Sequence, residues 1–313
     1  MAQQPPPGDP WFFSAPATGL RLEVTTSFHS PTFARFYPSY DRAFILPSEK
    51  EDEDGFRACL ALNRPGRTRQ ALVERFGPFN EYCMIAHDAA EGIEIGGINC
   101  IVLQYEDAEG RPVASVNLNY IFVDPARRGR GYLRRMLDAL RLALDEKLAP
   151  GRNALVFLEQ NDPFRLDETA YAQDTAHAGI DQFDRLHVWA RMGARILDFP
   201  YVQPALSAGQ EPDASLAYSL LDAQRTALPA TLLADHLERF FVLSVWKGRM
   251  PRDRAVADAQ LRDLRTRPAG AQVRILDPSP LLERVRGQKD RWSIFKDRPA
   301  SLVSAIMEQA GAQ

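Results

Sequence analysis

A short run of alternating arginine and glycine, Arg128-Gly129-Arg130-Gly131, follows an apolar segment and a proline turn near the middle of the chain. Glycines let backbone N–H groups approach a ligand closely, and arginine side chains pair with phosphate oxygens. When such a run leads into a helix, the first N–H groups of the helix also point at the ligand, and the helix dipole favours negative charge. The residue types and their order therefore predict a phosphate-binding loop.

A strand and a helix flank this loop in the sequence. Residues 120–123 are aromatic or β-branched and stop at Asp124-Pro125-Ala126, which is typical of a strand that ends abruptly. After the loop, apolar residues recur at helical spacing until Pro150-Gly151 ends the pattern, at Leu133, Met136, Leu137, Leu140, Leu144 and Leu148. The elements on either side are therefore those that a phosphate-binding loop needs.

The loop matches neither a P-loop, since it lacks the Gly-Lys-Ser/Thr ending, nor the G-x-G-x-x-G pattern of dinucleotide-binding folds. It resembles motif A of the GNAT superfamily of N-acetyltransferases, in which Arg/Gln-x-x-Gly-x-Gly/Ala follows a strand and a Val-x-Pro turn. Val123-Asp124-Pro125 supplies the turn, Arg128 the first motif position and Gly131 the fourth, while Leu133 stands where glycine or alanine is usual. The resemblance implies an α/β GNAT fold, with a mixed, mostly antiparallel central sheet that is flanked by helices and splayed at the acyl-CoA site.

The same resemblance implies acetyl-CoA or another acyl-CoA as cosubstrate, and it assigns residues to that ligand. Backbone N–H groups near Phe122 and Val123 would polarise the thioester oxygen, and the loop would hold the pyrophosphate. An asparagine that often follows the next strand in the family helps to hold the cofactor arm. The predicted cofactor contacts are Phe122, Val123, Arg128, Gly129, Arg130, Gly131, Tyr132, Leu133 and Asn161.

Acyl transfer to an amine needs a group that removes a proton from the nitrogen. Glu159 ends the apolar strand expected at 154–158 and is the preferred base, although a surface carboxylate at a strand end fits the same position. Trp189 stands where the family carries a tyrosine that protonates the departing thiolate, and an indole cannot do this. Tyr171 is the substitute that we predict as the acid. Asn117 and Asn119 either order a water or are ordinary strand residues.

The segment between the predicted base and Trp189 is longer than the family requires. Residues 162–185 form an acidic insertion, which either covers the acceptor side and attracts a cationic amine or is a solvated loop. We predict a small-molecule or peptide amine as the acceptor.

Composition excludes several other classes. The 313-residue chain has a formal net charge of -3 and only a short basic run, so we expect no nucleic-acid partner. No apolar stretch reaches the ~20 residues of a membrane helix, and the polar, proline-rich start lacks the apolar core of a signal peptide. Three cysteines without metal-binding spacing predict no metal site and a cytoplasmic protein.

The chain divides into three predicted parts. Residues 1–19 are a flexible leader, 20–225 form the acyltransferase domain with its insertion, and 226–313 form a helical extension. The extension packs on the domain or forms a homodimer contact. The function that we predict is acetyl transfer from acetyl-CoA to a primary amine by direct attack in a ternary complex. The alternatives are a non-catalytic CoA-binding or scaffolding protein and a transferase of longer acyl or aminoacyl groups.

Overall fold

The computed structural model describes residues 10–44, 50–107, 109–206, 209–288, 290–292 and 299–311. The chain divides into two compact units, of which the first comprises Met1–Leu155 with Arg239–Met250, and the second Val156–Glu238 with Pro251–Gln313. This division differs from the boundaries expected at residues 19 and 225, which stay predictions. A segment far along the chain therefore belongs to the first unit.

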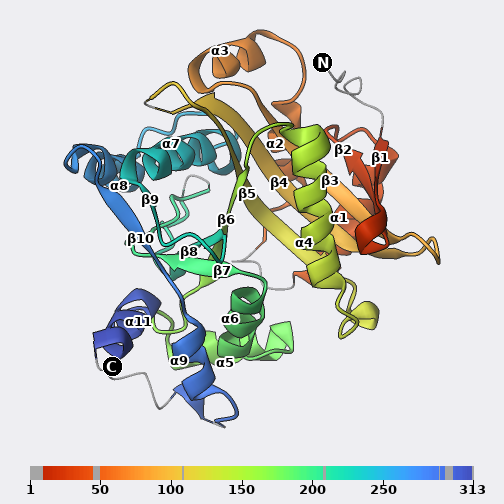
Figure 1. Cartoon of the computed structure of the whole chain (residues 1–313). Coiled ribbons are helices and arrows are strands. Elements are labelled where there is room, and N and C mark those ends of the chain that lie inside the picture. Colours follow the sequence, from red (N-terminus) through yellow and green to blue (C-terminus); the bar gives the residue numbers. More distant parts are fainter. Residues whose placement is uncertain are drawn as a thin grey trace. The chain divides into compact units, whose positions relative to one another are not determined.

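The first unit contains a meander of five strands, in which each strand pairs antiparallel with the next. It begins nine residues before the predicted start, because Trp11–Ala15 alternates apolar and polar side chains and pairs with the second strand. Residues 1–9 of the expected flexible leader lie outside the described residues. The strands are β1 (Trp11–Ala15), β2 (Leu20–Thr25), β3 (Phe79–Asp88), β4 (Glu94–Glu106) and β5 (Pro112–Val123) (Figure 1).

Four α-helices accompany this sheet, namely α1 (Pro31–Ala43), α2 (Glu53–Ala61), α3 (Arg67–Phe76) and α4 (Tyr132–Ala143), and α4 continues as a π-helical turn, Leu144–Leu148. The sequence reading missed α1, although Ser30 accepts the N–H of Phe33 and Pro31 occupies the first turn, as at many helix starts. The aromatic side chains of α1 and α2 pack with Cys83, Ile85 and Phe122, so both helices cover that face of the sheet.

A β-bulge interrupts the pairing of β4 with β5. Asn99 pairs with Tyr120 and Cys100 pairs with Leu118, which leaves Asn119 without a residue directly opposite. A bulge bends its strand and re-aims the extra side chain, and bulges are frequent beside active sites. Asn117, Asn119 and Tyr120 consequently turn toward the same face of the sheet.

The second unit is built on a further set of antiparallel strands in the order β6-β8-β7-β10-β9. These are β6 (Leu155–Asn161), β7 (Ala194–Leu197), β8 (Leu216–Leu221), β9 (Ala227–Pro229) and β10 (Gln272–Leu276). Its helices are α5 (Glu168–Ala178), α6 (Gln182–Arg191), α7 (Ala230–Phe240), α8 (Ala255–Thr266), α9 (Ser279–Val285) and α11 (Leu302–Gly311). The predicted mostly antiparallel α/β architecture with helices after residue 226 is confirmed, but β9 and β10 show that this stretch also supplies strands.

No helix within the described ranges has the length and apolar character needed to cross a membrane. The three cysteines, Cys59, Cys83 and Cys100, are buried with free thiols, as expected of small apolar side chains.

Candidate functional site

The predicted phosphate-binding loop lies between β5 and α4 in the first unit (Figure 1). Asp124 ends the strand and accepts the N–H of Ala126, which starts a short 3-10 turn, Pro125–Arg127. Gly129 and Gly131 then have φ values of 77° and 75°, in the left-handed region that L side chains rarely adopt, and open space surrounds both. The loop therefore depends on glycine for its backbone conformation and is accessible to a ligand.

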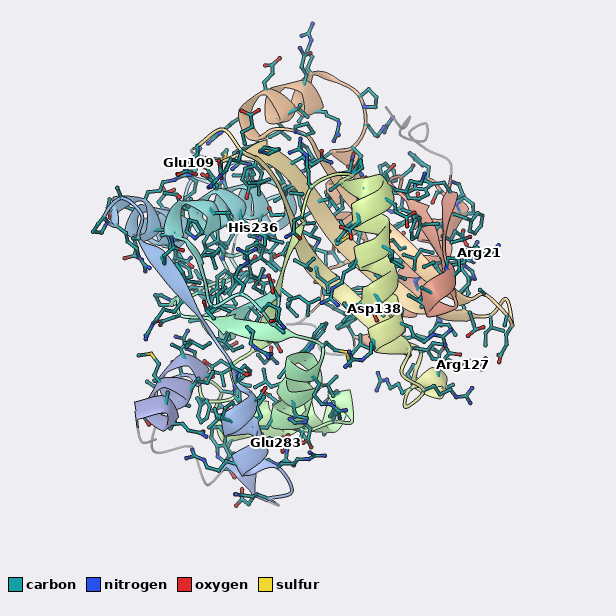
Figure 2. All side chains as sticks on the ribbon, viewed as in Figure 1. Arg21, Glu109, Arg127, Asp138, His236 and Glu283 are labelled. Carbon is teal, nitrogen blue, oxygen red and sulfur yellow. The ribbon has the colours of Figure 1, made fainter. Side chains whose placement is uncertain are left out.

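The start of α4 is suited to an anion. Gly131 is the N-cap residue and offers no side-chain acceptor, so the first N–H groups of the helix keep their hydrogen-bonding capacity. The first turn contains no acidic residue that would repel an anion. Arg130 is exposed, and Figure 2 shows Arg127 at the loop end of α4. The helix dipole, the free N–H groups and the arginine charge thus all favour a negatively charged ligand at this point.

Two side chains of α4 anchor this end of the helix to β3 and to the turn between β1 and β2. The Tyr132 hydroxyl donates to Asp88 Oδ2 at 3.1 Å, and Arg135 donates to the carbonyl oxygens of Thr18 and Gly19 at 2.7 and 3.0 Å. Burial alone would raise the pKa of Asp88, but the N–H groups of Glu91 and Ala90, followed by Tyr132 and Arg135, lower it. The Tyr132 ring is therefore turned inward, and only its backbone is available to a ligand.

At the end of β5, as at Tyr132, the backbone is available to a ligand and the side chain of Phe122 is not. Phe122 is buried with its ring against Phe36, at a centroid distance of 5.7 Å. On the paired strand, a Cβ at Gly97 would lie 2.7 Å from both rings, and a Cβ at Gly96 would lie 2.0 Å from the carbonyl oxygen of Phe122. The two glycines of β4 thus permit the close backbone approach that fixes Phe122 and Val123. Their thioester-binding role stays a prediction.

Glu159, the predicted base, is a half-buried residue of β6. It accepts hydrogen bonds from the hydroxyl of Tyr201 and from Gln203 Nε2 at 2.9 and 3.1 Å. Burial raises the pKa of Glu159 to about 7. The hydrogen bond from Tyr201 lowers this pKa in part, whereas the negative charge of Asp213 raises it further. Near neutral pH this carboxyl exists in both protonation states, as a proton acceptor requires.

Tyr171, the predicted acid, lies on the other face of the same sheet. Glu159 pairs with Tyr218 and the next residue, Gln160, pairs with Ala217, so Glu159 and Ala217 point to opposite faces. Tyr171 packs in the cluster that contains Ala217, and its hydroxyl donates to Asp181 at 2.6 Å. Burial and the Asp181 contact both raise the tyrosine pKa. The structure therefore does not bring the two predicted catalytic residues together.

The acidic insertion is a packed pair of helices, α5 and α6, and not a loop. Asp174 is buried and pairs with Arg185 at 2.6 Å, while Asp181 and Asp184 pair with Arg291 at 2.9 and 2.8 Å. These ion pairs neutralise much of the negative charge from which a cationic acceptor was inferred. Within the same unit, Asn161 ends β6 opposite Leu216 and Trp189 is half-buried in α6.

Sequence reasoning overlooked a buried polar cluster in the first unit. The carboxylate of Glu81 on β3 accepts from Asn99 Nδ2 at 2.6 Å and from Asn119 Nδ2 at 3.1 Å, and Asn119 also donates to Ser244 Oγ at 3.2 Å. A signal was present, because Glu81 is the one charged residue in the apolar run 79–86. Only the pairing of three strands shows that the asparagines converge on it.

No protein-family model and no curated protein matches the chain. Solved structures to which it is similar include Arabidopsis thaliana Naa50 in complex with a bisubstrate analogue, with 13% identity, a TM-score of 0.33 and coverage of 64% of this chain and 97% of that one. An aminoglycoside acetyltransferase from an uncultured soil metagenomic sample has 18% identity and a TM-score of 0.29, covering 51% and 86%. Ribosomal-protein-S5-alanine acetyltransferase from Vibrio fischeri has 10% identity and a TM-score of 0.33, covering 67% and 94%. All three similarities combine an identity below 25% with a TM-score below 0.5.

Proposed function

We propose that this protein is an N-acyltransferase of the GNAT type, which transfers an acetyl group from acetyl-CoA to a primary amine. The observation that carries the proposal is the loop at the start of α4, where two left-handed glycines, an uncapped helix N-terminus and exposed arginine charge meet directly after a strand. A diphosphate is the ligand chemistry that this combination suits best.

Acetyl-CoA would be held through its pyrophosphate by the backbone of residues 129–133 and by Arg128 and Arg130. The backbone N–H groups near Phe122 and Val123 would then polarise the thioester carbonyl. The amine nitrogen forms a bond to the carbonyl carbon, the carbon–sulfur bond breaks, and the sulfur leaves as a thiolate that takes up a proton. The amine must also lose a proton, and Glu159, whose pKa is raised by burial to about 7, stays the candidate that the sequence supplies for this step.

The acceptor in this proposal is a small-molecule or peptide amine. A positive charge on it is not required by the insertion, because Arg185 and Arg291 already balance Asp174, Asp181 and Asp184. Acetyl is the simplest acyl group, and an acyl-CoA with a longer chain would present the same pyrophosphate to the loop.

A second function, CoA binding without transfer, is favoured by one observation. Trp189 replaces the usual tyrosine, and the hydroxyl of Tyr171 is engaged with Asp181, so neither side chain is ready to protonate a thiolate. A thiolate can also take its proton from water, and this is why we favour the enzyme.

The test is calorimetric titration of the protein with acetyl-CoA and with free CoA, followed by turnover with spermidine, an aminoglycoside and a peptide with a free N-terminal alanine. Micromolar binding together with release of CoA in the presence of an amine would support the transferase. Binding without turnover of any amine would favour the non-catalytic alternative, and absence of binding would refute both.

A further inference from the structure

Glu81 is a buried carboxyl group that the acyl-CoA loop does not use. It is 2% exposed, its side chain is bound by residues of β4 and β5, and its backbone is bound by Asn63. Asn99 and Asn119 both donate to Oε1, whereas Oε2 has no hydrogen-bond partner among the described residues. An unpaired carboxylate oxygen in the interior is costly, so this arrangement calls for a physical explanation.

A second buried glutamate in the same unit shows what a purely structural carboxylate looks like. Glu23 accepts from Thr32 at 2.5 Å and from Arg35 at 2.5 Å, and it contacts His87 Nε2 at 3.0 Å. Burial would raise the pKa of Glu23, but these three partners hold it below its usual value. Both oxygens of Glu23 have partners that favour the charged form, whereas Glu81 has one oxygen without a partner and, among the described residues, no cation in hydrogen-bond contact.

The backbone around Glu81 is irregular in three places. Asn119 is the extra residue of the β5 bulge, Ser244 lies in the π-helical turn Phe241–Val245, and Lys247 has a φ of 54°, in the left-handed region. Bulges, π-helical turns and non-glycine residues with left-handed backbone conformation are frequent at functional sites. All three are linked to one carboxyl group, since Asn119 binds it, Ser244 binds Asn119, and the charge of Lys247 lowers its pKa.

Asn119 connects this interior group to the surface. Its side chain is half-buried, whereas Glu81, Asn99 and Asn117 are buried. The amide of Asn119 accepts from Asn117 at 2.8 Å and donates to Glu81, so its orientation is fixed from both sides. Asn119 precedes Phe122 by three residues on β5, about 10 Å along the strand, a span that a chain of about three waters can bridge.

We propose that Glu81, positioned by Asn119 at the β5 bulge, is the residue that accepts the proton of the attacking amine through water. This inference rests on the proposed acyltransferase function. As the nitrogen bonds to the thioester carbon, its proton passes to water and from water to Oε2 of Glu81, while the electrons of the broken carbon–sulfur bond leave on sulfur. Glu81 touches neither substrate, so it acts as a positioning and proton-accepting residue.

The electrostatic surroundings permit this role. Burial raises the pKa of Glu81 to about 7, and the hydrogen bonds from Asn99 and Asn119 lower it in part. The charged or titratable groups around it are Lys247, which pairs with Glu51 at 2.6 Å, and the three buried thiols, whose own pKa values are raised. The carboxylate form therefore predominates only above neutral pH.

The decisive experiment is the pH dependence of kcat/KM for Glu81→Gln, Glu81→Asp and Asn119→Ala, using acetyl-CoA and the fastest amine of the panel. Wild type should lose activity about tenfold per pH unit below pH 7. In Glu81→Gln this decrease of kcat/KM below pH 7, the acidic limb of the profile, should be absent. Its kcat at pH 8 should be about 10²- to 10³-fold lower than that of wild type. Glu81→Asp should restore a limb, and Asn119→Ala should shift it to higher pH, because Asn119 stabilises the carboxylate. The exposed Glu74→Gln is the matched control and should retain the wild-type profile.

Two further readouts separate this inference from the proposed function. Acetyl-CoA affinity should be unchanged in Glu81→Gln. Of the two carboxyl groups whose infrared bands titrate near pH 7, Glu81 and Glu159, only the band of Glu159 should remain in this variant. A folded Glu81→Gln protein with the wild-type kcat and the wild-type acidic limb would overturn the inference. Loss of the acidic limb in Glu159→Gln but not in Glu81→Gln would also overturn it. If Glu81→Gln does not fold, an unshifted limb in Asn119→Ala would overturn it. Wild-type protein that binds no acetyl-CoA would instead refute the proposed function.

Discussion

Replacing Gly131 by valine should abolish acetyl-CoA binding while leaving the fold intact. The φ of 75° imposes about 1–2 kcal/mol on an L side chain, and no atom lies within 4 Å of the added Cβ, so strain is the main cost to stability. For a unit of this size, the melting temperature should fall by roughly 2–8 °C. Relief of the strain rotates the N–H groups at the start of α4 away from the ligand. Loss of two hydrogen bonds to a charged group, each contributing about 1.5–3 kcal/mol, weakens binding at least 10²-fold.

A matched variant separates strain from binding. Gly110 has a φ of 72°, is exposed and also has open space around its Cβ, but it lies in the turn between β4 and β5. Gly110→Val should lower the melting temperature by a similar amount and bind acetyl-CoA like wild type. Calorimetric titration and thermal unfolding of both variants provide the comparison. Wild-type affinity in Gly131→Val, or equal loss of affinity in the two variants, would refute the assignment of the loop.

Three other outcomes are expected. Arg130→Gln should weaken acetyl-CoA binding about tenfold at low salt and reduce the salt dependence of the affinity, measured by calorimetry; unchanged binding would remove Arg130 from the site. Glu81→Gln should flatten the pH dependence of stability, because a carboxyl whose pKa rises from 4.5 to about 7 on folding destabilises the native state by about 2–3 kcal/mol more at pH 8 than at pH 5. Urea unfolding between these pH values measures this, and a wild-type slope in the variant would contradict it. Asp88→Asn should weaken acetyl-CoA binding only a few-fold, since Tyr132 and Arg135 lose an anchor but the glycines remain; a loss as large as in Gly131→Val would show that the anchor dominates.

The phosphate-binding loop could be predicted from sequence because its signals are local. A strand, a proline, two glycines and an apolar helical period all lie within residues 120–148. The structure places a strand, a left-handed loop and an uncapped helix there, at the expected positions. Helix α1 has comparable local signals, an N-cap at Ser30 and a proline at Pro31, so the sequence also contains the information that predicts it.

The other candidate site residues could not be predicted in this way. Their positions depend on which face of a strand each side chain occupies and on contacts between residues that are far apart in the sequence. Glu159 and Tyr171 are twelve residues apart, and only the register of β6 against β8 shows that they occupy opposite faces. The Glu81 cluster likewise requires the pairing of β3, β4 and β5 and a contact with Ser244, 125 residues from Asn119. No local pattern encodes such contacts. The acidic insertion looked like a charged surface because the arginine that balances two of its aspartates, Arg291, lies more than 100 residues later.

The return of Arg239–Met250 to the first unit has a consequence for how the protein is made. During synthesis, the strands of that unit leave the ribosome long before Ser244, whose carbonyl oxygen is contacted by the Cys59 thiol and whose hydroxyl is contacted by Asn119. Until Ser244 is present, Asn119 lacks one of its hydrogen-bond partners, and the polar cluster around Glu81 is incomplete. A fragment that ends at the expected domain boundary, residue 225, would lack Ser244 and the rest of Arg239–Met250, so it would not contain the complete first unit. The first unit is therefore completed only after Met250 has been synthesised.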